Sequence, residues 1–120
     1  MTYRVLIVDD EAHWRAVVAL YLDRLGYEIL QAEDLRQAIN QAIAERPDLI
    51  LTDLWLPDMN AVEAAVILKQ DPFASKIPVV VLTGVQDRGW KEKALQAGVI
   101  KYLTKPISLS ELGAVVKSLG

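Results

Sequence analysis

Short apolar runs alternate with amphipathic segments along the whole chain, and this alternation most limits the folds open to it. The apolar runs predict five strands, at Tyr3–Val8, Tyr27–Gln31, Leu49–Thr52, Ile77–Leu82 and Val99–Leu103. Segments with apolar residues at helical spacing follow them, at Glu11–Leu25, Asp34–Glu45, Ala61–Gln70, Gln86–Ala97 and Ser108–Leu119. Strands that alternate with helices predict an α/β fold, with a parallel sheet covered by helices on both faces.

Helical spacing also predicts which side chains face the core. The inner positions of the first two helices are Trp14, Val17, Val18, Tyr21 and Leu25, then Leu35, Ala38, Ile39, Ala42 and Ile43. Trp90 is expected at the exposed start of the fourth helix.

Length and composition narrow the class of protein. A chain of 120 residues predicts a single domain, residues 1–120. Without cysteine it has no disulfide frame and no thiol nucleophile, and a net charge of -3 argues against direct nucleic-acid binding. Its apolar runs fall well short of the roughly 18 residues that cross a bilayer, and its N-terminus does not read as a signal peptide. We therefore expect a cytoplasmic protein with no membrane contact.

Polar side chains follow four of the five predicted strands. Asp9 and Asp10 follow the first, Asp53 the third and Lys105 the fifth, and Thr83 follows the fourth. Because all parallel strands end at one edge of the sheet, these side chains are expected to converge. Three crowded carboxylates repel each other unless a cation neutralises them, and oxygen ligands favour Mg²⁺.

This set of groups is suited to phosphoryl transfer. A Mg²⁺ ion can bridge carboxylates to phosphoryl oxygens, a threonine hydroxyl can donate to them, and a lysine can pair with them. An aspartate can itself accept the phosphoryl group. No cysteine competes for that role, and the only histidine, His13, lies in the first predicted helix.

Four motifs resemble the receiver domain of two-component response regulators, including the chemotaxis regulators. They are Leu6–Glu11, Asp48–Leu54 with Pro57, Pro78–Gly84 and Tyr102–Pro106, and they stand in the family's order on the predicted strands. The resemblance implies a flavodoxin-like, doubly wound (βα)5 fold with strand order 2-1-3-4-5.

The resemblance also implies a role for each site residue. Asp53 would accept a phosphoryl group from a phosphohistidine on a sensor histidine kinase or a histidine phosphotransfer protein. Asp10, Asp53 and the backbone carbonyl of Trp55 would bind Mg²⁺, and Asp9 would act through a bound water. The side chains of Thr83 and Lys105, with the N–H of Gly84, would hold the phosphoryl oxygens.

The implied output is a conformational signal rather than a released product, so the domain is a switch and not an enzyme in the usual sense. Tyr102 would be the switch aromatic, moving inward when Thr83 is drawn to the phosphate. The Lys105–Pro106 bond is expected to be cis. The fourth helix, fifth strand and fifth helix would bind a downstream protein or a second copy of the chain.

The chain departs from the family pattern beside Asp53. Ala61 stands where glycine is usual, which suggests that Asn60 takes up a left-handed turn there. Trp55 and Val85 stand at positions that, in the family, control the hydrolytic water, and both are apolar. We expect slow self-dephosphorylation.

Other functions use similar residues. A haloacid-dehalogenase-type phosphatase would carry an Asp-x-Asp nucleophile motif after the first strand and its acidic pair late, the reverse of the order here. A flavodoxin-like cofactor binder would need a Ser/Thr/Gly-rich phosphate loop where Asp9, Asp10 and Glu11 stand. A receiver kept only as a docking module would not need the full residue set. For Tyr102 alone, a packing role is the alternative.

Overall fold

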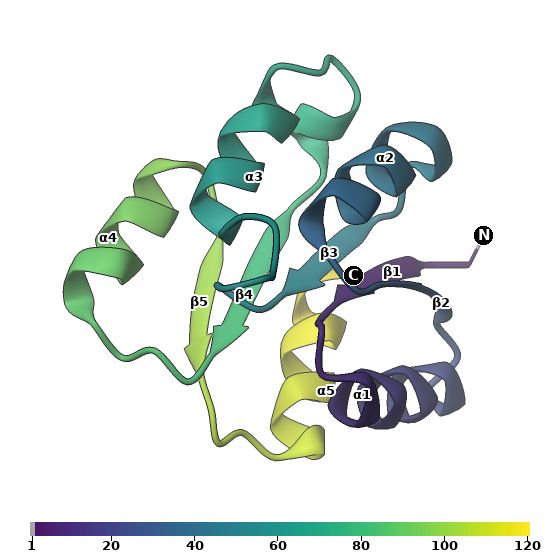
Figure 1. The fold of residues 1–120 in the computed structure, drawn as a ribbon. Helices are drawn as coiled ribbons and strands as arrows, with labels where there is room; N and C mark the ends of the chain where they lie inside the picture. The colour runs from purple at the N-terminus through teal and green to yellow at the C-terminus, as the bar shows by residue number, and fades with distance from the viewer. Residues whose placement is uncertain (1) are drawn as a thin grey trace.

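The computed structural model describes residues 2–120 as one five-stranded parallel sheet in the order β2-β1-β3-β4-β5 (Figure 1). The strands are β1 Arg4–Val8, β2 Glu28–Ala32, β3 Leu49–Thr52, β4 Val79–Thr83 and β5 Lys101–Thr104. The fold class and strand order predicted from the sequence are therefore confirmed.

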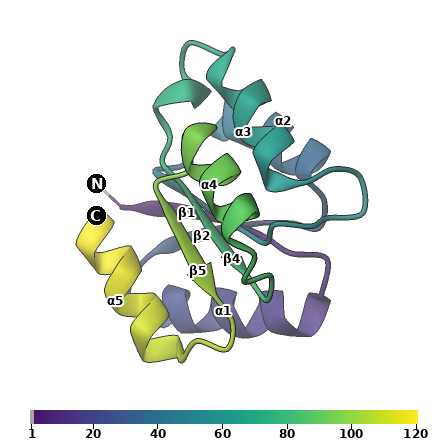
Figure 2. The same cartoon turned by 90° about the vertical axis from the view of Figure 1, so that its left-hand side faces the viewer.

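Each strand leads into a helix. The helices are α1 Ala12–Arg24, α2 Leu35–Glu45, α3 Ala61–Lys69, α4 Arg88–Gln96 and α5 Leu109–Leu119. They lie on both sides of the sheet, as the two views at right angles show (Figures 1 and 2). None of the helices in residues 2–120 is long and apolar enough to cross a membrane.

Side chains on one face of the sheet pack against α1 and α5. Val5 and Ile7 of β1 point to this face, because alternate residues of a strand point to opposite sides. They meet Leu22 of α1 and Leu112 of α5, all nearly inaccessible to solvent. This layer places the N-terminal turns of α1 beside the carboxyl ends of β1 and β3.

The opposite face carries α2, α3 and α4. Leu6 and Val8 of β1 pack there with Ile39 of α2, Ala64 of α3 and Ala94 of α4. The central strands β1, β3 and β4 are covered on both sides, which explains why their sequences are almost entirely apolar. A sheet buried in this way holds its carboxyl ends at fixed relative positions.

Polar capping shifts several element boundaries from the sequence prediction. Glu11 and Asp87 were expected inside helices, but each is an N-cap whose carboxylate accepts backbone N–H bonds. A short 3-10 helix, Ala74–Lys76, lies between the third predicted helix and the fourth predicted strand, where no regular structure was predicted. Its cause is Asp71, whose Oδ2 accepts from the N–H groups of Phe73 and Ala74 and folds the chain into a turn.

Three side-chain placements differ from the helical-spacing prediction. Leu25 and Ile43 were expected on inner faces, but their exposed fractions are 51% and 42%. Leu25 is the C-cap of α1, where the helix ends and Gly26 turns the chain with φ 100°. Trp90, expected at an exposed helix start, is instead partly buried and packs against the core under α4.

Candidate functional site

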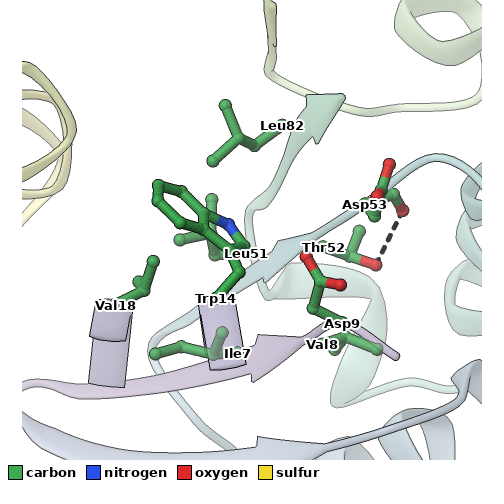
Figure 3. Close-up of a pocket in the computed structure, with 9 residues that line it drawn as sticks. All are labelled: Ile7, Val8, Asp9, Trp14, Val18, Leu51, Thr52, Asp53 and Leu82. Atoms are coloured by element: carbon green, nitrogen blue, oxygen red, sulfur yellow. Dashed lines mark hydrogen bonds between the residues drawn. The ribbon is translucent and has the colours of Figure 1, made fainter. Parts of the chain in front are cut away.

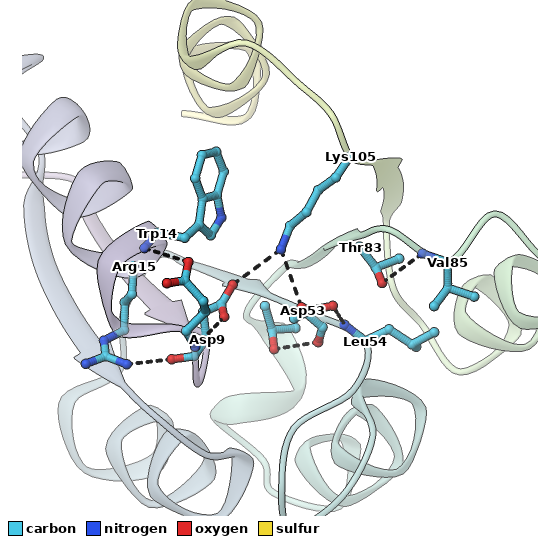
Figure 4. A network of polar contacts seen from close by, with 10 residues as sticks. Asp9, Trp14, Arg15, Asp53, Leu54, Thr83, Val85 and Lys105 are labelled. Atoms are coloured by element: carbon cyan, nitrogen blue, oxygen red, sulfur yellow. Dashed lines mark hydrogen bonds and ion pairs between the residues drawn. The ribbon is translucent and has the colours of Figure 1, made fainter.

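The carboxyl edge of the sheet brings together Asp9, Asp53, Thr83 and Lys105 (Figure 4). Asp9 directly follows β1, Asp53 directly follows β3, Thr83 ends β4 and Lys105 follows β5. Backbone bonds fix these ends: Asp53 donates its N–H to the Val8 carbonyl at 3.1 Å, and Lys105 donates to the Thr83 carbonyl at 2.8 Å.

Asp9 is the most buried carboxylate of the site, with a residue exposure of 4%. Its Oδ1 accepts from the Glu11 N–H at 2.9 Å, and its Oδ2 lies 3.5 Å from Lys105 Nζ. Burial raises the pKa of Asp9 above its ordinary value, against the Glu11 N–H and the Lys105 charge, while the charges of Asp53 and Asp10 add to the rise. The folded chain thus holds a desolvated acid here.

Asp53 is more accessible than Asp9. Its side chain is 20% exposed, and Oδ1 accepts from the Leu54 N–H at 2.6 Å. Its other oxygen, Oδ2, faces Lys105 Nζ at 3.4 Å. The backbone beneath is pinned by the Thr52 hydroxyl, which donates to the Asp53 carbonyl at 2.9 Å.

Lys105 lies between the two carboxylates, with its ammonium within 3.5 Å of an oxygen on each. The same ammonium is 5.7 Å from the ring centre of Trp14, which restricts it from a third side. The Lys105–Pro106 peptide bond is cis. The arrangement concentrates two negative charges around one positive charge at the end of β3.

A small cavity of about 10 Å³ adjoins the carboxylates of Asp9 and Asp53 (Figure 3). Asp9 and Asp53 border it at the polar end, while Trp14, Leu51 and Leu82 close the apolar end. That volume is close to the space one water molecule needs. The carboxylates of Asp9 and Asp53 therefore border a small pocket whose remaining lining is mostly apolar.

The donor set fits a hard divalent cation. Asp9 and Asp53 offer carboxylate oxygens, and the Lys105 ammonium already places a positive charge between them. Asp10, the third predicted acid, is exposed. No three His, Asp or Glu side chains within residues 2–120 are already grouped to hold a metal ion. Mg²⁺ needs only a few protein ligands because it retains several waters.

Thr83 and Tyr102 are linked through Val85. The Thr83 Oγ1 accepts from the Val85 N–H at 3.2 Å, and the Tyr102 hydroxyl donates to the Val85 carbonyl at 2.7 Å. Tyr102 is only 8% exposed. Burial raises its pKa, and the charges of Asp87 and Asp53 raise it further. The resemblance implied an aromatic that moves inward; here the ring is already inward.

The loop between Asp53 and α3 contains no residue in the left-handed region. Asn60, expected there, has φ -102° and is the N-cap of α3. Its side chain accepts from the Glu63 N–H at 2.9 Å, and Glu63 Oε1 accepts from the backbone N–H of Asn60 at 3.4 Å. This capping box begins α3 at Ala61 in helical conformation. The alanine is therefore accommodated, and the expectation of a left-handed Asn60 was wrong.

Trp55 and Trp90 form a contact that sequence reasoning missed. Trp55, in the loop after Asp53, is 47% exposed and packs edge to face on Trp90 of α4. Lys93 Nζ lies 4.7 Å from the centre of the Trp90 ring. No local pattern predicts the pair, because its members are far apart in the chain and meet only after α3 and α4 have packed.

Two further polar residues brace the site. Asp58, in the same loop as Trp55, accepts from the N–H groups of Leu35 at 3.0 Å and Arg36 at 2.7 Å. Arg15 of α1 donates to the Asp9 carbonyl at 2.6 Å (Figure 4). Neither stands in a motif with distinctive spacing, so only the fold reveals its contacts.

Comparison with known proteins agrees with this geometry. The response regulator receiver domain family matches residues 5–117. The phosphate regulon transcriptional regulatory protein PhoB of Pseudomonas aeruginosa is 41% identical over 96% of this chain and 50% of its own length. The response regulator PleD of Caulobacter vibrioides is 39% identical over 99% of this chain and 26% of its own length. The chain spans about half the length of the PhoB proteins it matches.

Solved structures give the same result. The chemotaxis response regulator CheY4 of Vibrio cholerae superposes with a TM-score of 0.93 at 27% identity, covering all of both chains. The receiver domain of the sensor histidine kinase PA1611 of Pseudomonas aeruginosa, with magnesium coordinated in its active-site cleft, has a TM-score of 0.89 at 29% identity and covers 99% and 98% of the two chains.

These matches favour a receiver over the phosphatase and cofactor-binder alternatives. The strand order, the acidic edge with its lysine and the extent of the family match point the same way. The chain belongs to the response regulator receiver domain family of two-component systems.

Proposed function

We propose that Asp53 accepts a phosphoryl group from a phosphohistidine in a Mg²⁺-dependent reaction. The observation that carries the proposal is the Lys105 ammonium, 3.4 Å from Asp53 Oδ2 and 3.5 Å from Asp9 Oδ2. Its positive charge lies beside the acceptor oxygen of Asp53 and offsets negative charge there. Receiver domains act as signalling switches, and the modification of Asp53 would be the event that sets this one.

The residues divide the chemistry between them. An oxygen of Asp53 attacks phosphorus while the bond from phosphorus to the imidazole nitrogen breaks, and the imidazole leaves with the electron pair. Asp10, Asp53 and the Trp55 carbonyl would hold Mg²⁺ directly and Asp9 would hold it through a water. The ion, when bound, offsets charge on the transferring phosphoryl oxygens.

After transfer, Lys105 and Thr83 would hold the phosphoryl oxygens, together with the N–H of Gly84. Gly84 is exposed, and a side-chain carbon placed on it would meet no heavy atom within 4 Å. Space around this backbone therefore supports an approach by the phosphoryl group. Movement of the Thr83 side chain toward the phosphate would weaken the hydrogen bond that Thr83 accepts from the Val85 N–H. It would therefore act on the loop around Val85, to which the Tyr102 hydroxyl also bonds.

The partners follow from this role. The donor would be a sensor histidine kinase or a histidine phosphotransfer protein. The readout would use the surface of α4, β5 and α5, where a downstream protein or a second copy of the chain would bind. Tyr102 supports this assignment, because it joins β5 to the loop that leads into α4.

The test is phosphorylation followed by intact mass measurement. The chain is incubated with Mg²⁺ and acetyl phosphate, and in parallel with a phosphorylated histidine kinase of verified activity. We expect a gain of one phosphoryl group that is lost in Asp53→Asn and in samples treated with a chelator. Asp23→Asn, which removes an exposed carboxylate on α1, should leave the gain intact. No gain from either donor would refute the proposal.

A further inference from the structure

Arg15 connects α1 to the ends of two strands. Its Nη1 donates to the Asp9 carbonyl at 2.6 Å, and its Nε donates to Gln31 Oε1 at 3.2 Å. Gln31 belongs to β2, and its own carbonyl accepts from Gln41 Nε2 of α2 at 3.2 Å. The guanidinium is thus held in place from a second direction, and it points away from the Lys105 side of Asp9 (Figure 4).

The carbonyl that Arg15 binds belongs to the peptide unit between Asp9 and Asp10. Other contacts already fix the rest of Asp9: its N–H donates to the Ala32 carbonyl, and its two carboxylate oxygens face the Glu11 N–H and Lys105. A peptide unit is planar, so fixing the carbonyl oxygen also fixes where the Cα of Asp10 lies. Asp10 itself is exposed and depends on that backbone for its direction.

We propose that Arg15 is a positioning residue for cation binding, acting through the Asp9–Asp10 peptide on the direction of the Asp10 carboxylate. This inference rests on the proposed function, in which Asp10 is a Mg²⁺ ligand. The charge of Arg15 affects cation binding in the opposite direction, because a guanidinium near the site repels a cation. Removing Arg15 therefore separates the two effects: lost positioning weakens Mg²⁺ binding, whereas lost charge strengthens it.

The test is a Mg²⁺ titration of the full chain, followed by tryptophan fluorescence and by calorimetry. Arg15→Met should raise the Kd for Mg²⁺ about 10-fold, the lower end of the effect of losing a group that orients a metal ligand. Arg15→Lys, which keeps the charge and one donor, should restore part of the affinity. Arg24→Met removes the same charge from the far end of the same helix and should leave the Kd unchanged.

A second variant guards against a folding defect. Gln31→Met keeps the Arg15 charge but removes its other partner, so it should raise the Kd in the same direction by a smaller factor. The melting temperature of each variant without Mg²⁺ reports whether it folds; if Arg15→Met does not, Gln31→Met decides. The positioning role is overturned if the deciding variant, Arg15→Met or else Gln31→Met, folds and binds Mg²⁺ as tightly as the wild type or more tightly.

The wild-type titration separates this inference from the proposed function. A wild-type chain that neither binds Mg²⁺ nor gains a phosphoryl group overturns both. A wild-type chain that binds Mg²⁺ and is phosphorylated, beside Arg15 and Gln31 variants of unchanged affinity, overturns the positioning role alone.

Discussion

The indole rings of Trp55 and Trp90 pack edge to face, with their centres 4.9 Å apart and their planes at 74°. The pair joins the loop that follows Asp53 to the first turn of α4, the helix of the proposed readout surface. An aromatic contact of this kind is worth roughly 0.5–1.5 kcal/mol beyond the area it buries. It also places an apolar side chain two residues from the proposed phosphoacceptor, where we expect it to limit the approach of water.

Replacing Trp55 with Asn and Val85 with Glu should speed loss of the phosphoryl group from Asp53. Polar groups at these positions can hold a hydrolytic water, which the indole and isopropyl groups cannot. We expect an increase on the order of 10-fold in the decay rate, below the ~10²-fold of a well-placed general base. Decay is followed by intact mass after the donor is removed. Phe73→Asn, at an exposed aromatic remote from Asp53 in the chain, is the control; an unchanged decay rate in the double variant would contradict the expectation.

Replacing Tyr102 with Phe should lower the free energy of unfolding by about 1 kcal/mol at neutral pH, the usual worth of one hydrogen bond. The ring stays buried, but the bond to the Val85 carbonyl is lost. Burial raises the folded-state pKa of Tyr102 above 10.0. Its contribution is therefore complete below pH 10.0 and falls as pH rises through the folded-state pKa.

The measurement is urea unfolding of both proteins from pH 8 upward, with the difference between them as the readout because the other tyrosines titrate in both. The stability of the wild type should fall more steeply with alkaline pH than that of Tyr102→Phe. Parallel curves would mean that Tyr102 titrates alike in the folded and unfolded chains.

Replacing Asp9 with Asn should raise the free energy of unfolding at neutral pH, although it removes a site residue. Burial raises the folded-state pKa of Asp9 above 3.8, so the ionised form costs stability in the folded chain. That cost is fully present above the folded-state pKa and disappears as pH falls toward 3.8. The advantage of Asp9→Asn should therefore shrink under acid, as thermal unfolding at several pH values will measure. A variant less stable than the wild type at pH 7 would show that the pairing with Lys105 outweighs burial.

Local signals in the sequence were sufficient to predict the strands, the helices and a parallel sheet, whereas the strand order came from the family resemblance. Each strand is a short apolar run such as Leu49–Thr52, and each helix has apolar residues at a regular spacing. Parallel strands that end at one edge then bring Asp9, Asp53 and Lys105 together without further information. Boundaries were less certain, because a carboxylate such as Glu11 can either begin a helix or cap it.

Contacts between segments distant in sequence could not be predicted in this way. Trp90 was expected to be exposed because it stands at the start of α4, but it packs against the core and against Trp55 in the loop after Asp53. The inward position of Tyr102 depends on where the Val85 carbonyl points, which is a property of the loop backbone. Arg15 likewise carries no motif, since its partner is a main-chain carbonyl.

Replacing Asp58 with Asn should destabilise the chain by about 0.5–1 kcal/mol at neutral pH, the usual worth of a charge at a helix N-terminus. Burial alone would raise the pKa of Asp58, but the N–H groups of Leu35, Arg36, Asp58 and Met59 outweigh it and lower the pKa below 3.8. The contribution is therefore complete above pH 3.8 and is lost as pH falls through the folded-state pKa. Chemical unfolding at pH 7 and pH 3 measures it: the two proteins should differ at pH 7 and converge at the lower pH. Glu33→Gln, which removes an exposed carboxylate just before α2, is the matched control, and an equal loss in that variant would reduce the Asp58 effect to general charge near the helix.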